Sequence, residues 1–511
     1  MFSKVLAGGI HGIDSYLAQI EVDVSQGMPG FEMVGLPGSE VREARERVRV
    51  ALKNSAFKLP PQKITVNISP ADIRKEGSAF DLGIAIGILV SLEYLSEEIL
   101  ENTLFIGELG LNGELKPVRG ILPIMMMAHE KGINRCILPR ENALEGAVIP
   151  GIRIVGVKDL EETIHYCQLE ECHRDNFLMP TTMDASSLIL QESSKAMPDF
   201  ADIRGQELVK RAAVIAAAGF HHLLITGIPG TGKTMIARRI PSILPPLSRK
   251  ESLEVSKIYS VSGLLKPGNP LVRERPFLHP HHTISSQALV GGGRIPRPGI
   301  ISLSHRGVLF LDEFPEFGRE NIEVLRQPLE DKEVQIARSY GSVTYPADVM
   351  IVAAMNPCPC GFYPDRNRCQ CTENEVKRYR SRISGPIYDR IDLCVEAKAL
   401  PIEDLQKRES GQSSRDLRRQ VMRARAMQEK RYRKTPFFFN SDLGAGDIAR
   451  FCPLGKEEED YMERLFSFWG LSARAYHRIL KTARTIADLE EAETIKKEHL
   501  SEAMSFRGWE N

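Results

Sequence analysis

Residues 227–234 read Gly227-Ile228-Pro229-Gly230-Thr231-Gly232-Lys233-Thr234. This octapeptide fits G-x-x-x-x-G-K-[ST], the phosphate-binding loop of nucleoside triphosphatases. An apolar run of strand length, 223–226, precedes it, and a helical pattern begins at 235, so the strand–loop–helix context is present. The glycines let backbone amides curl around phosphate oxygens at the positive end of a helix. The octapeptide therefore predicts that the chain binds a nucleoside triphosphate.

The side chains that would act on the nucleotide follow from the same pattern. Lys233 is expected to reach the β- and γ-phosphates, and Thr234 is expected to hold Mg²⁺. Four apolar residues, 308–311, end in Asp312 and Glu313. A buried strand of this kind brings Asp312 to the Mg²⁺ shell and places Glu313 where it can polarise the attacking water.

A third apolar strand, 349–354, is followed by Met355 and Asn356. An amide at this place can orient the water and contact the γ-phosphate. Together with the acidic pair, Asn356 predicts ATP hydrolysis with ATP and Mg²⁺ as cofactors.

Composition limits the class of protein. A chain of 511 residues is long enough for about two to four domains, each with its own core. No run approaches the length of a membrane span, and the N-terminus lacks a secretory apolar region. Nine cysteines, four of them bunched, suit a reducing compartment better than a disulfide framework. We therefore expect a cytoplasmic protein with no membrane partner.

Charge is balanced overall but not locally. Lys plus Arg equal Asp plus Glu at 67 each, so net charge gives no indication of a nucleic-acid partner. Basic residues are concentrated between Lys407 and Lys434, however. A solvated helical face and a nucleic-acid contact explain this run equally well.

The pattern along the chain predicts an α/β multidomain protein. Residues 1–165 mix alternating strands (16–24 and 64–68) with helices (39–53 and 79–92). Residues 166–198 are predicted to form a linker. Residues 199–396 are predicted to form an ATPase domain with a mostly parallel sheet, and residues 397–511 a helical lid.

These motifs resemble those of the AAA+ ATPases, and specifically the magnesium-chelatase-like ComM/YifB family. The resemblance covers essentially the whole chain and implies a P-loop core, a helical lid and an N-terminal α+β domain like that of Lon protease (ribosomal-S5-domain-2-like). The stretches that carry it, besides the phosphate loop, are Asp202–Gln206, His279–Ser285, Met355–Gly361 and Gly385–Asp392.

The resemblance assigns two arginines that spacing alone leaves open. Arg390, in Tyr-Asp-Arg-Ile-Asp, looks like the arginine finger that is offered to the γ-phosphate of a neighbouring subunit. Arg474, in Leu-Ser-Ala-Arg, looks like the lid arginine that senses the same phosphate. An arginine acting in trans implies a homo-oligomeric ring, and rings of this kind are usually hexamers.

Four thiols follow Asn356 at Cys358, Cys360, Cys369 and Cys371. Four thiolates suit structural Zn²⁺, although C-x-C pairs are harder to aim at one ion than C-x₂-C pairs. A zinc site and reduced or partly disulfide-bonded thiols are equally compatible with this spacing. For His279, His281 and His282, which lack helical spacing, we favour a structural or DNA-proximal loop over a metal site.

Two segments interrupt the ATPase pattern and are candidates for contact with a polymer. Residues 273–300 include Arg294 and Arg297, and residues 333–346 predict a β-hairpin that bears Arg338 and turns near residues 340–341. In the resembled family such insertions face the central channel of the ring. Sequence-independent binding to DNA phosphates and contact between subunits are the two explanations.

The N-terminal region resembles the Lon protease domain without its catalytic dyad. Ser78 corresponds to the nucleophile, but Leu122 stands where the lysine base is expected, and Lys116 lies too early in the chain. Because a serine needs an adjacent base to become nucleophilic, we expect no proteolysis. Ser78 is expected instead to cap the following helix.

The family resemblance implies the overall activity. Members of this kind are hexameric ATP-driven helicases that act on single-stranded and branched DNA and promote branch migration in homologous recombination during natural transformation. A metal-chelatase motor subunit and a non-translocating assembly or chaperone switch are the alternatives, and an ATP-dependent protease is disfavoured by Leu122.

Overall fold

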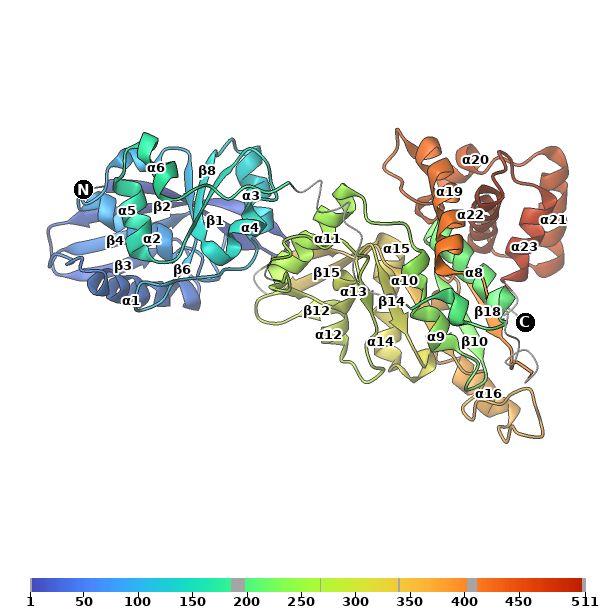
Figure 1. Ribbon diagram of the computed structural model, residues 1–511. Helices are drawn as coiled ribbons and strands as arrows, with labels where there is room; N and C mark the ends of the chain where they lie inside the picture. The colour runs from blue at the N-terminus through green and yellow to red at the C-terminus, as the bar shows by residue number, and fades with distance from the viewer. Residues whose placement is uncertain (1, 185–197, 267, 339–340, 402–410, 508–511) are drawn as a thin grey trace. The chain divides into compact units, whose positions relative to one another are not determined.

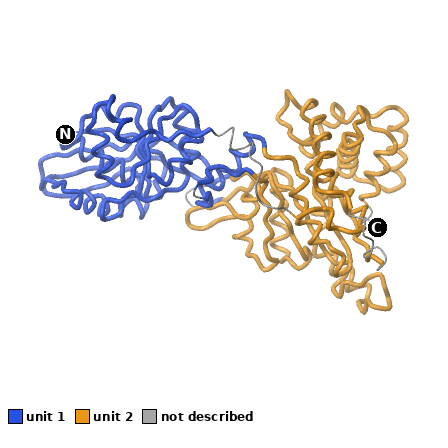
Figure 2. The backbone as a smooth tube through the Cα atoms, in the orientation of Figure 1, with its two compact units in different colours: residues 1–192, 248–273, 337–344 blue, residues 193–247, 274–336, 345–511 orange. Residues whose placement is uncertain are grey.

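The computed structural model describes residues 2–184, 198–266, 268–338, 341–401 and 411–507. The chain divides into two compact units (Figure 2). Unit 1 contains residues 1–192, 248–273 and 337–344, and unit 2 contains residues 193–247, 274–336 and 345–511. Both units combine helices with a β-sheet, so the predicted α/β multidomain class is confirmed (Figure 1).

Unit 1 is built on a seven-stranded mixed sheet with the order β3-β4-β2-β1-β5-β8-β9. The pairs β1–β2 and β2–β4 are antiparallel, and the remaining neighbours are parallel. The expected strands at 16–24 and 64–68 are confirmed as β2 and β4. The strand bounds are β1 Phe2–His11, β2 Asp14–Ser25, β3 Gly30–Val34, β4 Lys63–Ser69, β5 Thr103–Phe105, β8 Arg135–Pro139 and β9 Arg153–Val157, with the separate ladder β6 Glu108–Leu109 and β7 Leu115–Lys116.

Helices cover both faces of this sheet because its strands alternate apolar side chains between them. Phe105 and Ile137 point to the core shared with α1, α2 and α5, whereas Leu104 and Cys136 point to the core shared with α3 and α4. Every residue of α2 is buried, since it packs directly on β1 and β2. The helix bounds are α1 Ser39–Asn54, α2 Asp81–Ser91, α3 Ile121–Glu130, α4 Ala143–Gly146, α5 Leu160–Gln168 and α6 Glu171–Phe177.

A helix from the middle of the chain completes the core of unit 1. Helix α11 (Arg249–Ser262) begins at a capping box formed by Ser248 and Glu251 and packs on α3. Ser260 Oγ donates to Glu145 Oε1 at 2.5 Å, and Leu253 packs against the α3 core. The predicted domain limits assigned residues 248–273 and 337–344 to the ATPase domain, whereas the structure groups both with unit 1.

Unit 2 is built on a five-stranded sheet with the order β11-β14-β17-β10-β18, and all four ladders are parallel. The three apolar runs expected to be strands are confirmed as β10, β14 and β17. Each is buried along its whole length, as strands covered on both faces are. The bounds are β10 Leu223–Gly227, β11 Phe277–Leu278, β14 Val308–Leu311, β17 Met350–Met355 and β18 Leu393–Ala397.

The segment 273–300, expected to be an insertion, contains a strand of the ATPase sheet. Phe277 and Leu278 form β11, which pairs with β14 at the sheet edge. Two residues are too few for an alternation pattern, so this strand could not be recognised in the sequence. The remainder of the segment holds the short ladder β12 (Gly291–Gly292) and β13 (Arg297–Pro298).

Helices of the ATPase region and of the predicted lid share one hydrophobic core. Helix α8 packs against both α19 and α22, and apolar residues from all three belong to the same cluster. The predicted boundary at residues 396–397 lies inside unit 2 and stays a prediction. The helix bounds are α8 Glu207–Gly219, α9 Lys233–Ala237, α10 Ile240–Ile243, α12 Ser286–Val290, α13 Ile300–Leu303, α14 Arg319–Glu323, α15 Arg326–Asp331, α16 Glu373–Arg380, α17 Gly385–Tyr388, α19 Ser414–Tyr432, α20 Ala445–Phe451, α21 Lys456–Trp469, α22 Ala473–Leu489 and α23 Lys497–Ser505. None of the helices in the described ranges is both long and apolar enough to cross a membrane.

A buried carboxylate joins the sheet of unit 2 to α22. Asp392 Oδ2 accepts from the backbone amide of His222 at 3.0 Å, and Asp392 Oδ1 lies 3.8 Å from Nη1 of Arg478 on α22. His221 lies between Asp392 and Thr485, another residue of α22. Burial alone would raise the pKa of Asp392, but His221 and Arg478 hold it well below its usual range.

We predict that Asp392→Ala destabilises unit 2 by about 3–5 kcal/mol, because it leaves buried positive charge without its partner. Since the pKa of Asp392 is lowered on folding, this contribution is present at neutral pH and is lost only in acid, below the ordinary carboxyl pKa of about 4. Calorimetric unfolding at pH 7 measures the effect. Glu457→Ala, which removes an exposed partner of Lys497, is the control and should leave the transition unchanged. An unchanged transition in Asp392→Ala would contradict the assignment.

Candidate nucleotide-binding site

The phosphate loop connects β10 to α9. Gly230 and Gly232 have φ values of 84° and 85°, in the left-handed region that favours glycine. Gly227 lies close to the neighbouring strand, since a Cβ atom there would come within 2.5 Å of the Ala397 carbonyl oxygen. The loop ends at Lys233, the first residue of α9, so backbone amides at a helix start are available to a phosphate.

Lys233 joins the loop to the neighbouring strand. Its Nζ donates to the carbonyl oxygens of Gly227 and Ile228 at 2.6 and 3.1 Å, and to Asn356 Oδ1 at 3.1 Å. Burial lowers the pKa of Lys233, while Asp312 and Glu313 oppose that shift. The structure therefore brings together two predicted site residues, Lys233 and Asn356, that are far apart in the sequence.

The two predicted Mg²⁺ ligands also meet. Thr234 Oγ1 donates to Asp312 Oδ2 at 2.7 Å. Two neighbouring ligands of an octahedral Mg²⁺ ion lie about 3 Å apart, so a hydroxyl and a carboxylate at this separation suit the ion. Thr234 and Asp312 are thus the residues that would hold Mg²⁺ beside the phosphates.

Glu313 follows Asp312 in a left-handed backbone conformation, with a φ of 53°. Its side chain is 56% exposed, and Oε2 lies 3.1 Å from Nδ1 of His282. The neighbouring His279 packs against Phe310 of β14, with ring centroids 4.7 Å apart. We expected these histidines in a structural or DNA-proximal loop. The contact between His282 and Glu313 was missed, because only the folded chain brings β11 beside β14.

Arg390 and Arg474 converge on one acidic residue, Glu330 at the end of α15. The Arg390 guanidinium pairs with Glu330 and donates to the Pro386 carbonyl oxygen, and its side chain is 3% exposed. Arg474 Nη2 lies 3.6 Å from the same carboxylate, and its side chain is 61% exposed. A role for Arg390 at another subunit therefore requires it to leave Glu330.

Two of the three candidate DNA-binding arginines lie on the β12–β13 segment, and the third, Arg338, lies on the predicted hairpin. Arg294 and Arg297 are exposed on the β12–β13 segment. Tyr345 of β16 donates from its hydroxyl to the Pro296 carbonyl oxygen at 2.8 Å, so this segment lies beside the predicted hairpin. That hairpin is confirmed as β15 (Glu333–Arg338) and β16 (Gly341–Pro346); its turn, 339–340, lies outside the described residues.

The basic run near residues 407–434 is partly engaged within the chain where the structure describes it. Arg425 donates to the Phe438 carbonyl oxygen, and Arg431 pairs with buried Asp488. Arg423 pairs with Glu491 at 2.7 Å. These contacts favour a structural role for the three arginines, whereas Arg415, Arg418 and Lys430 of the same helix are exposed.

The Lon-like segment of unit 1 has a carboxylate at its serine. Ser78 Oγ donates to Glu108 rather than capping a helix, because α2 begins only at Asp81, so the capping prediction is wrong. Leu122 is fully buried on α3 at the position of the expected lysine. The absence of proteolytic activity stays a prediction.

Two groups of side chains in the described ranges lie close enough to hold a metal ion. One is the four-cysteine cluster, and the other is an exposed trio, Glu170, Cys172 and His173. The histidines 279, 281 and 282 are in neither group, and their assignment to a structural or DNA-proximal loop stays a prediction.

We predict that Asn356→Ala lowers kcat for ATP about 10²–10³-fold with a smaller change in KM, because it removes an oriented amide from the reacting phosphate. Steady-state ATPase kinetics measure this. Asn367→Ala, an exposed asparagine of the following loop, is the matched control and should retain activity. Equal activity in the two variants would contradict the role of Asn356.

Family models of magnesium chelatase match most of the chain. Residues 20–142 match the model described as subunit ChlI of Mg-chelatase, residues 199–405 match magnesium chelatase, subunit ChlI, and residues 411–507 match its C-terminal model.

Full-length relatives are also similar. The chain is 41% identical over 498 residues to competence protein ComM of Haemophilus influenzae, covering 97% of this chain and 95% of the relative. It is 42% identical over 497 residues to protein YifB of Escherichia coli, with the same coverage of each chain. It is 37% identical over 506 residues to a protein of Mycobacterium tuberculosis, covering 99% of this chain and 98% of the relative.

Proposed function

Because the chain belongs to the ComM/YifB family of magnesium-chelatase-like AAA+ proteins, we propose that it is an ATP-hydrolysing DNA motor that promotes branch migration in homologous recombination during natural transformation. The similarity to a competence protein over nearly the whole length is the observation that carries this proposal. The competence role is that of the relative, and the motor activity is our inference for this chain.

The hydrolytic step rests on residues at the carboxyl edge of the parallel sheet. Lys233 and the loop amides bind the phosphates of ATP, and Thr234 and Asp312 hold Mg²⁺. Glu313 accepts a proton from the water that attacks the γ-phosphorus, and Asn356 orients that water. The bond from the γ-phosphorus to the bridging oxygen breaks, which gives ADP and phosphate.

A ring would complete the site. We propose that Arg390 leaves Glu330 and contacts the γ-phosphate held by a neighbouring subunit, where its charge stabilises the transition state. Arg474, exposed at the start of α22, would report the same phosphate to the helices packed on α8. We propose a homohexamer as the active form.

Two segments support DNA as the polymer. Exposed Arg294 and Arg297 can bind phosphates without reading base sequence, and the β15–β16 hairpin stands beside them. We propose that these segments contact single-stranded and branched DNA, with Arg338 on the same hairpin.

A chelatase-type motor subunit is the second candidate, favoured by the descriptions of the matching family models. It would share the ATP site but would not be expected to need DNA. DNA dependence therefore separates the two functions, and it equally separates the motor from an assembly or chaperone switch.

We predict that branched or single-stranded DNA stimulates ATP hydrolysis at least about tenfold and that the protein drives three-strand branch migration with ATP but not with a non-hydrolysable analogue. Strand exchange from a preformed three-stranded intermediate measures the second activity. Lys233→Ala removes the phosphate ligand and should abolish both. ATPase activity that DNA does not change, together with a lack of branch migration, would contradict the proposal.

A double variant, Arg294→Ala with Arg297→Ala, tests the contact surface in the same assay. It should weaken DNA binding and reduce the salt dependence of that binding, while basal ATPase activity is retained. Arg319→Ala with Arg326→Ala, on α14 and α15, makes a matched change of charge on two other elements and should leave binding unchanged.

A further inference from the structure

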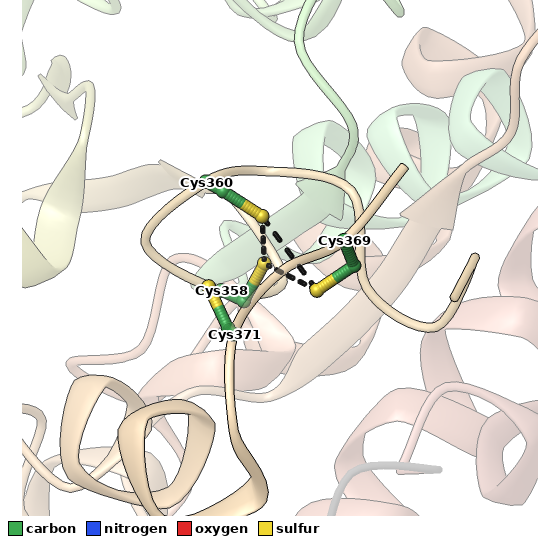
Figure 3. Close-up of side chains that lie close together, drawn as sticks. All are labelled: Cys358, Cys360, Cys369 and Cys371. Atoms are coloured by element: carbon green, nitrogen blue, oxygen red, sulfur yellow. Dashed lines mark hydrogen bonds between the residues drawn. The ribbon is translucent and has the colours of Figure 1, made fainter. Parts of the chain in front are cut away.

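Four thiols gather in the loop between β17 and α16, immediately after Asn356 (Figure 3). Cys358 Sγ lies 3.4 Å from Cys360 Sγ and 3.8 Å from Cys369 Sγ, and the last two sulfurs are 3.6 Å apart. The sulfur of Cys371 lies within 4.8 Å of each of the others. Both C-x-C pairs therefore converge on one point, which their spacing alone did not indicate.

These distances exclude a disulfide, one of the chemical states left open by the sequence. Four sulfurs at 2.3 Å from a tetrahedral Zn²⁺ ion lie about 3.8 Å from one another. A disulfide would need a sulfur–sulfur distance of about 2.0 Å. The separations of 3.4–3.8 Å match the metal geometry and are far from that of a disulfide.

We propose that Cys358, Cys360, Cys369 and Cys371 bind one structural Zn²⁺ ion as thiolates. Four protein ligands close the tetrahedron and leave no position for water, which is the arrangement of structural rather than catalytic zinc. Zinc binding forms four Zn–S bonds and releases the protons of those thiols that are protonated beforehand.

The surroundings suit a negatively charged metal–thiolate group. The Tyr363 backbone amide donates to Cys358 Sγ at 3.4 Å, as second-shell donors to metal ligands do. The guanidinium group of Arg368 lies 4.1 Å from the centre of the Phe362 ring, and those of Arg366 and Arg380 lie 5.2 and 5.4 Å from the Tyr363 ring. Three guanidinium groups therefore pack on the aromatic residues of the loop that carries the four thiols.

The apolar core of this loop is small. It contains the cysteines, Val376 and two partly buried aromatic residues, Phe362 and Tyr363. Small cores of this kind are usually stabilised by a metal or by disulfides. We infer that zinc adds to the hydrogen bonds that hold the segment between β17 and α16.

The proposed zinc loop contacts the phosphate loop. A Cβ atom on Gly361 would come within 2.6 Å of Pro229 Cδ and 3.9 Å of Asn356 Cγ, so backbone of the cysteine segment lies directly against the nucleotide site. Arg380 Nε on α16 donates to the Pro357 carbonyl oxygen at 3.3 Å. We infer that the zinc loop holds Pro229 and Asn356 in position. This second part rests on the proposed ATP site, whereas the metal site does not.

Metal analysis tests the site directly. Protein purified without a His tag and without added metal should contain about one Zn²⁺ per chain by mass spectrometry, and Cys358→Ser with Cys369→Ser should contain less than about one tenth of that. Cys394→Ser, at a cysteine that belongs to neither group of potential metal ligands, should keep its zinc. Zinc-free wild-type protein would overturn the proposal, and so would a disulfide among these cysteines.

Alkylation of the intact wild-type protein keeps the test independent of folding in the variants. The four cysteines should resist maleimide until a strong zinc chelator removes the ion, whereas Cys172 should react at once. Immediate modification of all four in native protein would contradict zinc ligation.

The link to the nucleotide site has its own test. Gly361→Ala should raise the KM for ATP about tenfold while zinc content is retained, because the added methyl group displaces Pro229. Gly132→Ala is the matched control, because Gly132 also has a positive φ, 72°, and an added Cβ there meets nothing within 4 Å. An unchanged KM would overturn this link without affecting the metal site. Loss of DNA stimulation with normal basal ATPase would instead speak against the proposed motor function.

Discussion

The hydrogen bond between Lys233 and Asn356 is the contact on which the rest of the site depends. It joins the phosphate loop after β10 to the end of β17, and it exists because these strands are parallel neighbours whose carboxyl ends meet at one edge. The same edge brings Thr234 to Asp312 at the end of β14. A continuous apolar sheet therefore assembles binding, metal and water-positioning groups from segments far apart in the sequence. The hydrolytic roles that we propose for these residues depend on the parallel pairing of β10, β17 and β14.

Two further contacts connect this edge to the remainder of unit 2. Buried Asp392 joins the start of β10 to α22, the helix whose first turn carries Arg474. Glu330 faces both Arg390 and Arg474, so in the proposed ring this carboxylate would compete with the γ-phosphate for two positive charges. Nucleotide in a neighbouring subunit would provide the stronger partner for Arg390. If Arg390 exchanged Glu330 for that phosphate, the nucleotide bound in one subunit would change the contacts made by the helices of the predicted lid.

The sequence predicts the parts of the site that obey local rules. Buried parallel strands appear as unbroken apolar runs, so 223–226, 308–311 and 349–354 were recognisable, and the polar residues after them were correctly expected to meet. Contacts made by packing were not recognisable. His282 meets Glu313 only because the two-residue strand β11 pairs with β14, and α11 joins unit 1 through Ser260 and Glu145. Ser78 was expected to cap a helix, but the fold gives its hydroxyl a closer acceptor in Glu108.

We propose that the active site is shared between subunits, and mixing inactive subunits separates this arrangement from a site within one chain. If Arg390 acts in trans, equal amounts of Lys233→Ala and Arg390→Ala protein should restore ATPase activity, since about one quarter of the interfaces in randomly mixed rings carry both wild-type groups. Lys233→Ala mixed with Asp312→Asn is the control, because both residues belong to the same half of the site and no interface is repaired. Recovery to about a quarter of wild-type activity is the predicted result. Activity no higher than that of the control mixture would contradict the shared site.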